Sequence, residues 1–358
     1  MTTSPLQRAG VLGFAACTPL GYALEPTLAA MGANLSNITA SPARTLGGEF
    51  APASCLVDPA LAREERLAQL LAHGLDDVQA LLDLHGFDHP PILLGIPSGL
   101  DEQTRQRINT VQHQAGFPTH GSASFEYGRA SGFAALAQAL QMLAQRTHRC
   151  VIVGGLDSLC APATIETLVH ARRLLEPFTE GTIPGEAAAF MVLLHPEDAA
   201  LDPSQALWIE RVAVARGRPF ANSGAVNADA LTQVFHKLQE GAPSAPRGST
   251  LRVHRVIAAH SGEGYFGRSF SLACLRVAGL MPEPLLVTLT ADRVGDIGAA
   301  AGPLGLAFAA YWMAQERRST TGIRRALVYS ESDGGEVGAA VLCGHPRSWQ
   351  RVANSARA

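Results

Sequence analysis

Lysine is almost missing from this chain of 358 residues. Lys237 is the single lysine, so any mechanism that needs a catalytic lysine has one candidate. Long apolar runs are missing too, because no uninterrupted stretch reaches the ~18 residues of a membrane-spanning helix. The first residues also lack the basic start and apolar stretch of a signal peptide. We therefore expect a cytoplasmic protein without a membrane span.

The chain also lacks a large excess of charge of either sign. Its 28 basic and 31 acidic residues give a formal net charge of −3, and the sequence pI is about 6.5. No basic surplus is available to neutralise phosphates, so we expect no nucleic-acid partner. The six cysteines contain no CxxC pair, which indicates neither a disulfide framework nor a zinc site. We expect no metal and no cofactor.

Apolar residues are abundant, at 47% of the chain, and they fall into alternating strands and helices. Buried strands are expected at 9–16, 90–97, 149–159, 185–195, 208–215, 251–259, 285–290, 325–330 and 337–343. A helical stretch is expected after the turn at 18–21, to about residue 31. Longer helices are expected at 59–86, 101–115, 130–145, 227–239, 266–278 and 298–317. This alternation predicts an α/β protein. The order of elements repeats, which predicts two similar halves, 1–200 and 205–346, before a frayed polar tail at 347–358.

Several ordered segments resemble the β-ketoacyl synthase branch of the thiolase superfamily. They are GFAACTPLG (13–21), the helix from Arg129 with the VGG at 153–155, GEAAAFMVL (185–193), GDIGAAAGPLGLAFAA (295–310) and SESDGGEVGAAVL (330–342). Each segment consists mostly of small residues, but together they span nearly the whole chain. The resemblance implies a thiolase-like five-layer αβαβα fold of two similar halves, normally assembled as a dimer.

The resemblance also implies an active site with a cysteine nucleophile, two histidines and a supporting lysine. The family's glycine spacing, matched by Gly132 and by the glycines at 154–155, puts Arg129 at the nucleophile position. A guanidinium stays protonated and cannot attack a thioester. We interpret Arg129 as paired with Glu126, in preference to an anion clamp at a helix N-terminus. Ser131 lies nearby, but not on the turn that carries the nucleophile.

His260, in the segment AAHSGEGYF (258–266), matches the family's first histidine. Without a nucleophile, we interpret it as a remnant that packs and hydrogen-bonds. The second histidine position is Asp296, whose charge would repel an enolate. We expect Asp296 to cap the helix that starts near Gly298. Glu263 is the best carboxylate on the His260 loop, and the sequence gives it no partner.

The remaining family positions have changed as well. The supporting lysine falls near Ala291 and is therefore absent. The gatekeeping phenylalanine, before the closing pair Gly334 and Gly335, is replaced by Asp333. A pantetheine route past this position would be more polar than in an acyl-processing enzyme. None of the cysteines is expected at a helix N-terminus beside a base, so we expect no catalytic residue.

Three functions follow from this reading. In the first, the chain is a catalytically inactive synthase homologue that acts as a protein-binding adaptor. GGLDS (154–158) with IPGEAAAF (183–190) resembles degenerate synthase-like proteins of type VI secretion clusters, which implies a role in loading a secreted effector. In the second, it resembles a chain-length factor and pairs with an active ketosynthase through the 90–160 region. In the third, it is an acyltransferase or hydrolase with an altered site at His260 and Glu263. A homodimer is the family's default.

Overall fold

The computed structural model describes residues 8–58, 60–177, 179–202, 206–220, 226–240, 251–315 and 323–344, so the predicted tail at 347–358 lies outside the described residues. The strands of the first half are β1 (Ala9–Cys17), β4 (Ile92–Gly95), β5 (Ala123–Phe125), β6 (Cys150–Ser158) and β7 (Glu186–Leu194). Those of the second half are β8 (Leu207–Arg216), β9 (Arg255–Ala258), β10 (Val287–Leu289), β11 (Arg324–Glu331) and β12 (Glu336–Gly344).

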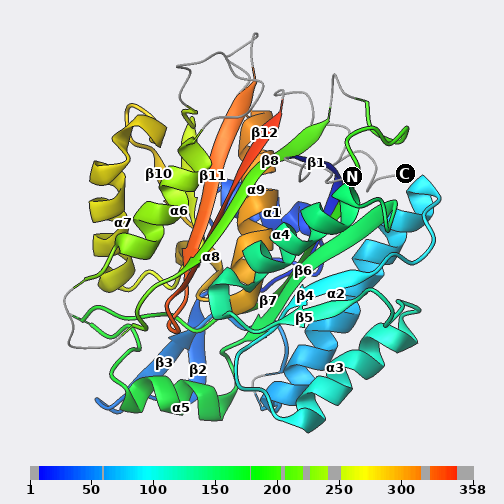
Figure 1. The fold of residues 1–358 in the computed structure, drawn as a ribbon. Helices are drawn as coiled ribbons and strands as arrows, with labels where there is room; N and C mark the ends of the chain where they lie inside the picture. The colour runs from blue at the N-terminus through cyan, green and yellow to red at the C-terminus, as the bar shows by residue number, and fades with distance from the viewer. Residues whose placement is uncertain are drawn as a thin grey trace.

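These ten strands form one mixed sheet in the order β10-β9-β11-β12-β8-β1-β7-β6-β4-β5 (Figure 1). Each half has the same internal order, because its second strand lies between its third and fourth, and its fifth lies next to its first. The directions match as well: β4 is parallel to β5 and β6, and β9 is parallel to β10 and β11. The halves join through antiparallel pairing of residues 9–11 with 207–209. The order of strands is thus repeated in space as well as along the chain.

Two helices, α4 (Ser131–Ala144) and α9 (Ala301–Gln315), lie between the halves and contact strands of both (Figure 1). Twelve of the 15 residues of α9 are buried, so it is apolar on all sides, as a central helix must be. Small residues let the layers approach closely: a Cβ on Gly132 of α4 would lie 2.6 Å from Pro303 of α9.

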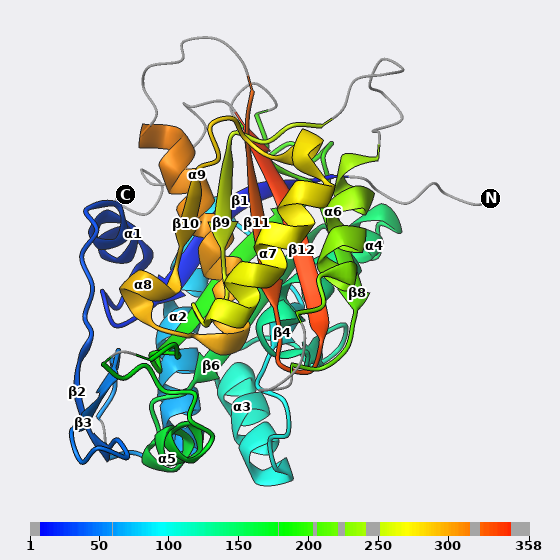
Figure 2. The ribbon, with the colours of Figure 1, turned by 90° about the vertical axis from the view of Figure 1, so that its left-hand side faces the viewer.

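The outer helices cover the other faces of the sheet. α2 (Arg63–His85) packs on the first half and carries α3 (Glu102–Gln114), whereas α6 (Asp229–Gln239) packs on the second half beside α7 (Gly264–Arg276) (Figure 2). Helices, half-sheet, central helices, half-sheet and helices make five layers, so the predicted thiolase-like αβαβα fold is confirmed. Within the described part of the chain, no helix is long and apolar enough to cross a membrane.

Smaller elements complete the fold. They are α1 (Leu24–Gly32), β2 (Thr39–Arg44), β3 (Phe50–Ala53), α5 (Pro162–His170), α8 (Ala291–Val294) and the 3₁₀ turns Gly128–Ala130, Ala278–Leu280 and Gly298–Ala300. The helical stretch at α1 was expected from the turn before it, but the β2–β3 hairpin and α5 were not. These two pack together at one end of the molecule (Figures 1 and 2). The hairpin was missed because β2 is mostly exposed and neither short strand has a regular alternation of apolar and polar residues.

Candidate functional site

The residues at the predicted nucleophile position form a tight turn at the start of the central helix α4. Gly128 has a φ of 53°, a left-handed conformation that favours glycine, and the 3₁₀ turn Gly128–Ala130 leads directly into α4. The hydroxyl of Ser332, from the turn between β11 and β12, accepts a hydrogen bond from the Ala130 amide and donates one to the Tyr127 carbonyl. Ser131 accepts a hydrogen bond from the Tyr127 amide. The turn is therefore fixed by both halves of the fold.

Arg129 lies inside this turn with only 6% of its surface exposed, and its guanidinium contacts two carboxylates. Nε lies 3.0 and 3.1 Å from the two oxygens of Asp296, and Nη2 lies 2.5 Å from Oδ2. Nη1 donates to Oδ1 of Asp333 at 2.7 Å. Burial alone would lower the pKa of Arg129, but the two carboxylates raise it further above its ordinary value. The side chain is therefore charged and fully engaged.

Three positions that the sequence analysis identified as changed, 129, 296 and 333, are thus joined in one ion cluster. The predicted pairing of Arg129 with Glu126 is wrong, because Glu126 pairs with Arg105 of α3. The predicted cap is present, since Asp296 Oδ1 accepts a hydrogen bond from the Gly298 amide at 3.1 Å. This cap is a minor part of the role of Asp296, whose main partner is the arginine.

A second arginine, Arg173, extends the cluster and was missed by the sequence analysis. It holds Glu263 with Nε and Nη2, at 2.8 and 2.6 Å, and reaches Asp333 with Nη1 at 2.6 Å. Glu263 thereby gains a partner that no spacing in the sequence indicated, and it also accepts a hydrogen bond from Ser261. Burial would raise the pKa of Asp333, but the guanidinium groups of Arg129 and Arg173 hold it well below its ordinary value.

The two halves of the fold contribute opposite charges to the ion cluster. Its cations, Arg129 and Arg173, come from the first half, and its anions, Glu263, Asp296 and Asp333, come from the second. The ion pairs therefore join the two halves around the start of α4.

His260 is buried beside this cluster, and its imidazole is neutral. Its Nδ1 accepts a hydrogen bond from the Gly262 amide at 3.1 Å, and its ring lies against Phe266 and Tyr329. Burial lowers its pKa to about 3, and the charge of Arg129 acts in the same direction. This environment is the packed, hydrogen-bonded one that the sequence analysis expected.

Glu331, on β11 next to the cluster, was not identified from the sequence. It is 5% exposed; Ser269 donates to its Oε2 at 2.8 Å, and Oε1 has no hydrogen-bond partner among the described residues. Burial raises its pKa to about 8, despite the opposing effects of Ser269 and Arg129. Glu331 is therefore mostly protonated at neutral pH and adds little negative charge to the cluster.

The closing glycines shape the turn that carries Asp333. Gly335 has a φ of 88°, and a Cβ there would lie 2.7 Å from the backbone of Arg218. Gly334 lies next to Glu336 at the same turn. A cavity of about 10 Å³ next to the turn, lined by Phe266 and Glu331 among others, has room for about one water molecule. No space for an acyl chain is found there among the described residues.

The cysteines in the strands are unreactive thiols. Burial raises the pKa of Cys17, Cys150 and Cys343 to about 12, so these thiols are protonated and inert. Cys274, on α7, also has a raised pKa because it is partly buried. In the part of the chain that the structure describes, no cysteine or serine side chain forms a hydrogen bond with the His260 imidazole.

Comparisons with known proteins agree with this fold. Residues 124–199 match the family model of the beta-ketoacyl synthase N-terminal domain. The oxazolomycin ketosynthase domain of Streptomyces albus has a TM-score of 0.73 and 16% identity over 94% of this chain and 74% of its own. The ishigamide ketosynthase/chain length factor has a TM-score of 0.72 and 15% identity, covering 95% of this chain and 99% of its own.

A third solved structure, the ketosynthase from module 6 of the bacillaene synthase of Bacillus subtilis 168, has a TM-score of 0.69 and 13% identity over 94% of this chain and 72% of its own. No curated protein sequence matches the chain. The chain therefore has the thiolase-like fold of ketosynthases. The resemblance to β-ketoacyl synthases, stated from the sequence, is confirmed.

Proposed function

We propose that this chain is a catalytically inactive ketosynthase homologue that works by binding other proteins. One observation carries the proposal: the side chain at the predicted nucleophile position is Arg129, buried and bound to Asp296 and Asp333. Catalysis by this fold needs a thiolate there and a donor for the enolate at position 296. A paired guanidinium and a carboxylate supply neither.

The experiment is incubation of the full chain with malonyl- and acyl-carrier protein, followed by intact-mass spectrometry. We expect no acyl adduct and no release of carbon dioxide, with an active ketosynthase run in parallel as the positive control. An Arg129→Cys variant tests whether the missing thiol alone explains the lack of activity. It restores a thiol but keeps Asp296, so it should also fail to decarboxylate malonyl-carrier protein. A covalent adduct on the unaltered chain would overturn the proposal and favour an altered acyltransferase.

The partner is the finer part of the proposal. The resemblance of segments 154–158 and 183–190 to synthase-like proteins of type VI secretion clusters supports an adaptor that loads a secreted effector. Affinity purification of the tagged chain from its host, with quantitative mass spectrometry, tests this. Enrichment of an effector or spike protein is expected, whereas enrichment of a ketosynthase with its carrier protein would favour the alternative below.

The alternative is a partner of an active ketosynthase, similar to a chain-length factor. It is supported by the likeness to the ishigamide ketosynthase/chain length factor, which the chain covers over 99% of its length. Against it, the cavity beside the turn that carries Asp333 holds about one water molecule, which is too little for a growing acyl chain. Co-expression with a ketosynthase from the same genome, followed by size-exclusion chromatography, would detect a stable heterodimer.

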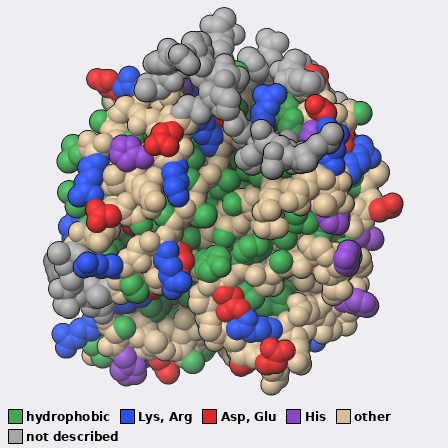
Figure 3. Space-filling view, in the orientation of Figure 1, with side chains coloured by type: hydrophobic (Ala, Val, Ile, Leu, Met, Phe, Trp, Pro, Cys, Tyr) green, Lys and Arg blue, Asp and Glu red, His purple; other side chains and the backbone are tan. Residues whose placement is uncertain are grey.

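We also propose that the chain pairs with a second copy through β5. This strand forms one edge of the described sheet, Ala123 and Ser124 on it are exposed, and Tyr127 nearby is 44% exposed. Hydrophobic side chains gather near the middle of the face that shows β5, and charged ones lie mainly toward its margin (Figure 3). Exposed strand edges and apolar patches favour association. A Ser124→Pro variant, which removes one amide donor, should shift the mass in sedimentation analysis from dimer to monomer.

A further inference from the structure

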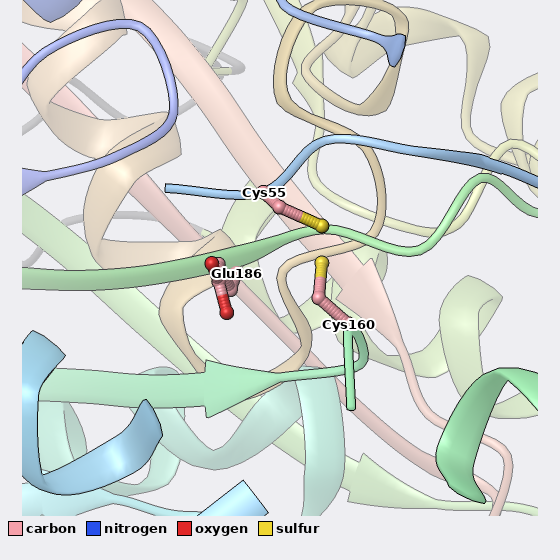
Figure 4. A group of neighbouring side chains, drawn as sticks. All are labelled: Cys55, Cys160 and Glu186. Atoms are coloured by element: carbon pink, nitrogen blue, oxygen red, sulfur yellow. The ribbon is translucent and has the colours of Figure 1, made fainter. Parts of the chain in front are cut away.

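Two cysteines from distant segments face one another outside the ion cluster. Cys55 follows β3, and Cys160 lies between β6 and α5. Their sulfur atoms and a carboxylate oxygen of Glu186 all lie within 4.8 Å of one another. Figure 4 shows the two sulfur atoms pointing toward each other, with the carboxylate to one side.

The carboxylate is already saturated, so this group does not suit a metal ion that needs an oxygen ligand. Oε1 of Glu186 accepts hydrogen bonds from the amides of Leu56 and Val57 and from Arg66 Nη2. Oε2 accepts from Arg66 Nε and from the Ser158 hydroxyl. Five donors occupy about four lone-pair sites of a carboxylate. The chemistry left to the group is therefore that of its two thiols.

The same hydrogen bonds hold the two thiols together. Leu56 follows Cys55 directly, and Ser158 is two residues before Cys160, so both cysteine segments are tied to one carboxylate. The Cys160 thiol also lies 3.3 Å from the Ser54 carbonyl, against the first segment. The two sulfurs are thus held close to each other, as formation of a disulfide requires.

The two thiols differ in exposure and acidity. Cys55 is partly exposed, and hydrogen bonding with Cys160 lowers its pKa despite the opposing effect of burial. Cys160 is 2% exposed, and burial raises its pKa. A more acidic, accessible thiol beside a buried partner is the arrangement of an attacking and a resolving cysteine.

We propose that Cys55 and Cys160 form a reversible disulfide by exchange with a low-molecular-weight disulfide such as oxidised glutathione. The Cys55 thiolate attacks one sulfur of glutathione disulfide, its S–S bond breaks, and one glutathione thiolate leaves. Cys160 then gives up its proton to solvent and attacks the Cys55 sulfur, displacing the second glutathione. The protein dithiol is oxidised by two electrons, and glutathione disulfide is reduced to two thiols.

The bond would link the β2–β3 hairpin to the loop that leads into α5. Cys160 belongs to the apolar cluster of these elements, with Ala51, Ala53, Ile165 and Val169. The chain after α5 leads to Arg173, so the linkage would also restrain one arm of the ion cluster. A rise in the ratio of oxidised to reduced glutathione would therefore stabilise this end of the molecule.

The test is differential alkylation of the full chain after equilibration in glutathione buffers of rising oxidised fraction. On unfolding in denaturant, alkylated thiols should fall from six to four, and peptide mapping should find the Cys55–Cys160 linkage. Dithiothreitol should restore all six. Retention of six reactive thiols in the oxidised buffer, or losses spread over other cysteines, would overturn the proposal.

Two variants separate the roles of the thiols. Cys160→Ala should trap a mixed disulfide with glutathione on Cys55, whereas Cys55→Ser should give neither product. Cys274→Ser is the matched control, because Cys274 is also partly exposed but lies on α7 in the other half; it should keep the linkage. If Cys160→Ala fails to fold, the peptide map of the unaltered chain still decides. A linkage between any other pair would contradict the proposal.

Discussion

Replacing Arg129 by methionine should destabilise the fold strongly. The side chains of Arg129 and Asp296 are 7% and 1% exposed, so the substitution leaves a buried carboxylate without its bidentate partner. Removing one member of a buried ion pair costs about 3–5 kcal/mol. Methionine keeps much of the length and the contact with Phe266, so most of the loss is electrostatic. Urea unfolding followed by circular dichroism measures it.

The second substitution in this test removes the orphaned charge. Asn at position 296 keeps an oxygen for the Gly298 amide, so the double variant Arg129→Met with Asp296→Asn should recover roughly 2 kcal/mol. Arg268→Met is the control, because Arg268 and Glu180 are 58% and 65% exposed and such pairs contribute about 0–1 kcal/mol. If Arg129→Met cost no more than this control, the ion cluster would not stabilise the fold, and the reasoning would be refuted.

Other substitutions test the neighbouring features. Glu331 has a raised pKa, so its contribution to stability is complete below about 4.5 and is lost as the pH rises to about 8. As the pH rises between these values, the free energy of unfolding of Glu331→Gln should therefore increase relative to that of the unaltered chain, by at most about 5 kcal/mol. If urea unfolding gave the same difference at both pH values, Glu331 would not be a buried acid with a raised pKa. Gly155→Ala should cost about 3 kcal/mol or more, because the new Cβ would lie 2.1 Å from the Ala299 carbonyl oxygen. Gly267→Ala, in open space on α7, should instead stabilise by roughly 0.5–1 kcal/mol in thermal unfolding, and equal effects would refute the packing argument.

Much of the fold could be predicted from the sequence, because its central strands are continuous apolar runs and its central helix α9 is apolar on all sides. The partners of the site residues could not be predicted in the same way. Arg129 pairs with residues 167 and 204 positions away, whereas Glu126, only three positions away, turned out to belong to another pair. Spacing in the sequence identifies neighbours along the chain. These charges meet because the two halves of the fold pack against each other around the start of α4.

The same limit applies to Arg173 and to the two facing thiols. Arg173 follows α5, a short helix that the sequence analysis did not expect, and nothing in its local sequence distinguishes it from the other arginines of an arginine-rich chain. The thiols lie in loops after β3 and after β6, and both loops are held by hydrogen bonds to Glu186, a residue distant from each of them along the chain. Such contacts depend on loops, where periodicity carries no information.

The ion cluster also has a consequence for how the sequence can change over generations. A mutation at 129 alone leaves Asp296, whose side chain is 1% exposed, without its ion-pair partner, so this single step lowers stability before any new chemistry is gained. Substitutions that convert the cluster must therefore arrive together or be preceded by stabilising changes elsewhere. Once these buried ion pairs have formed, they are therefore difficult to lose one residue at a time.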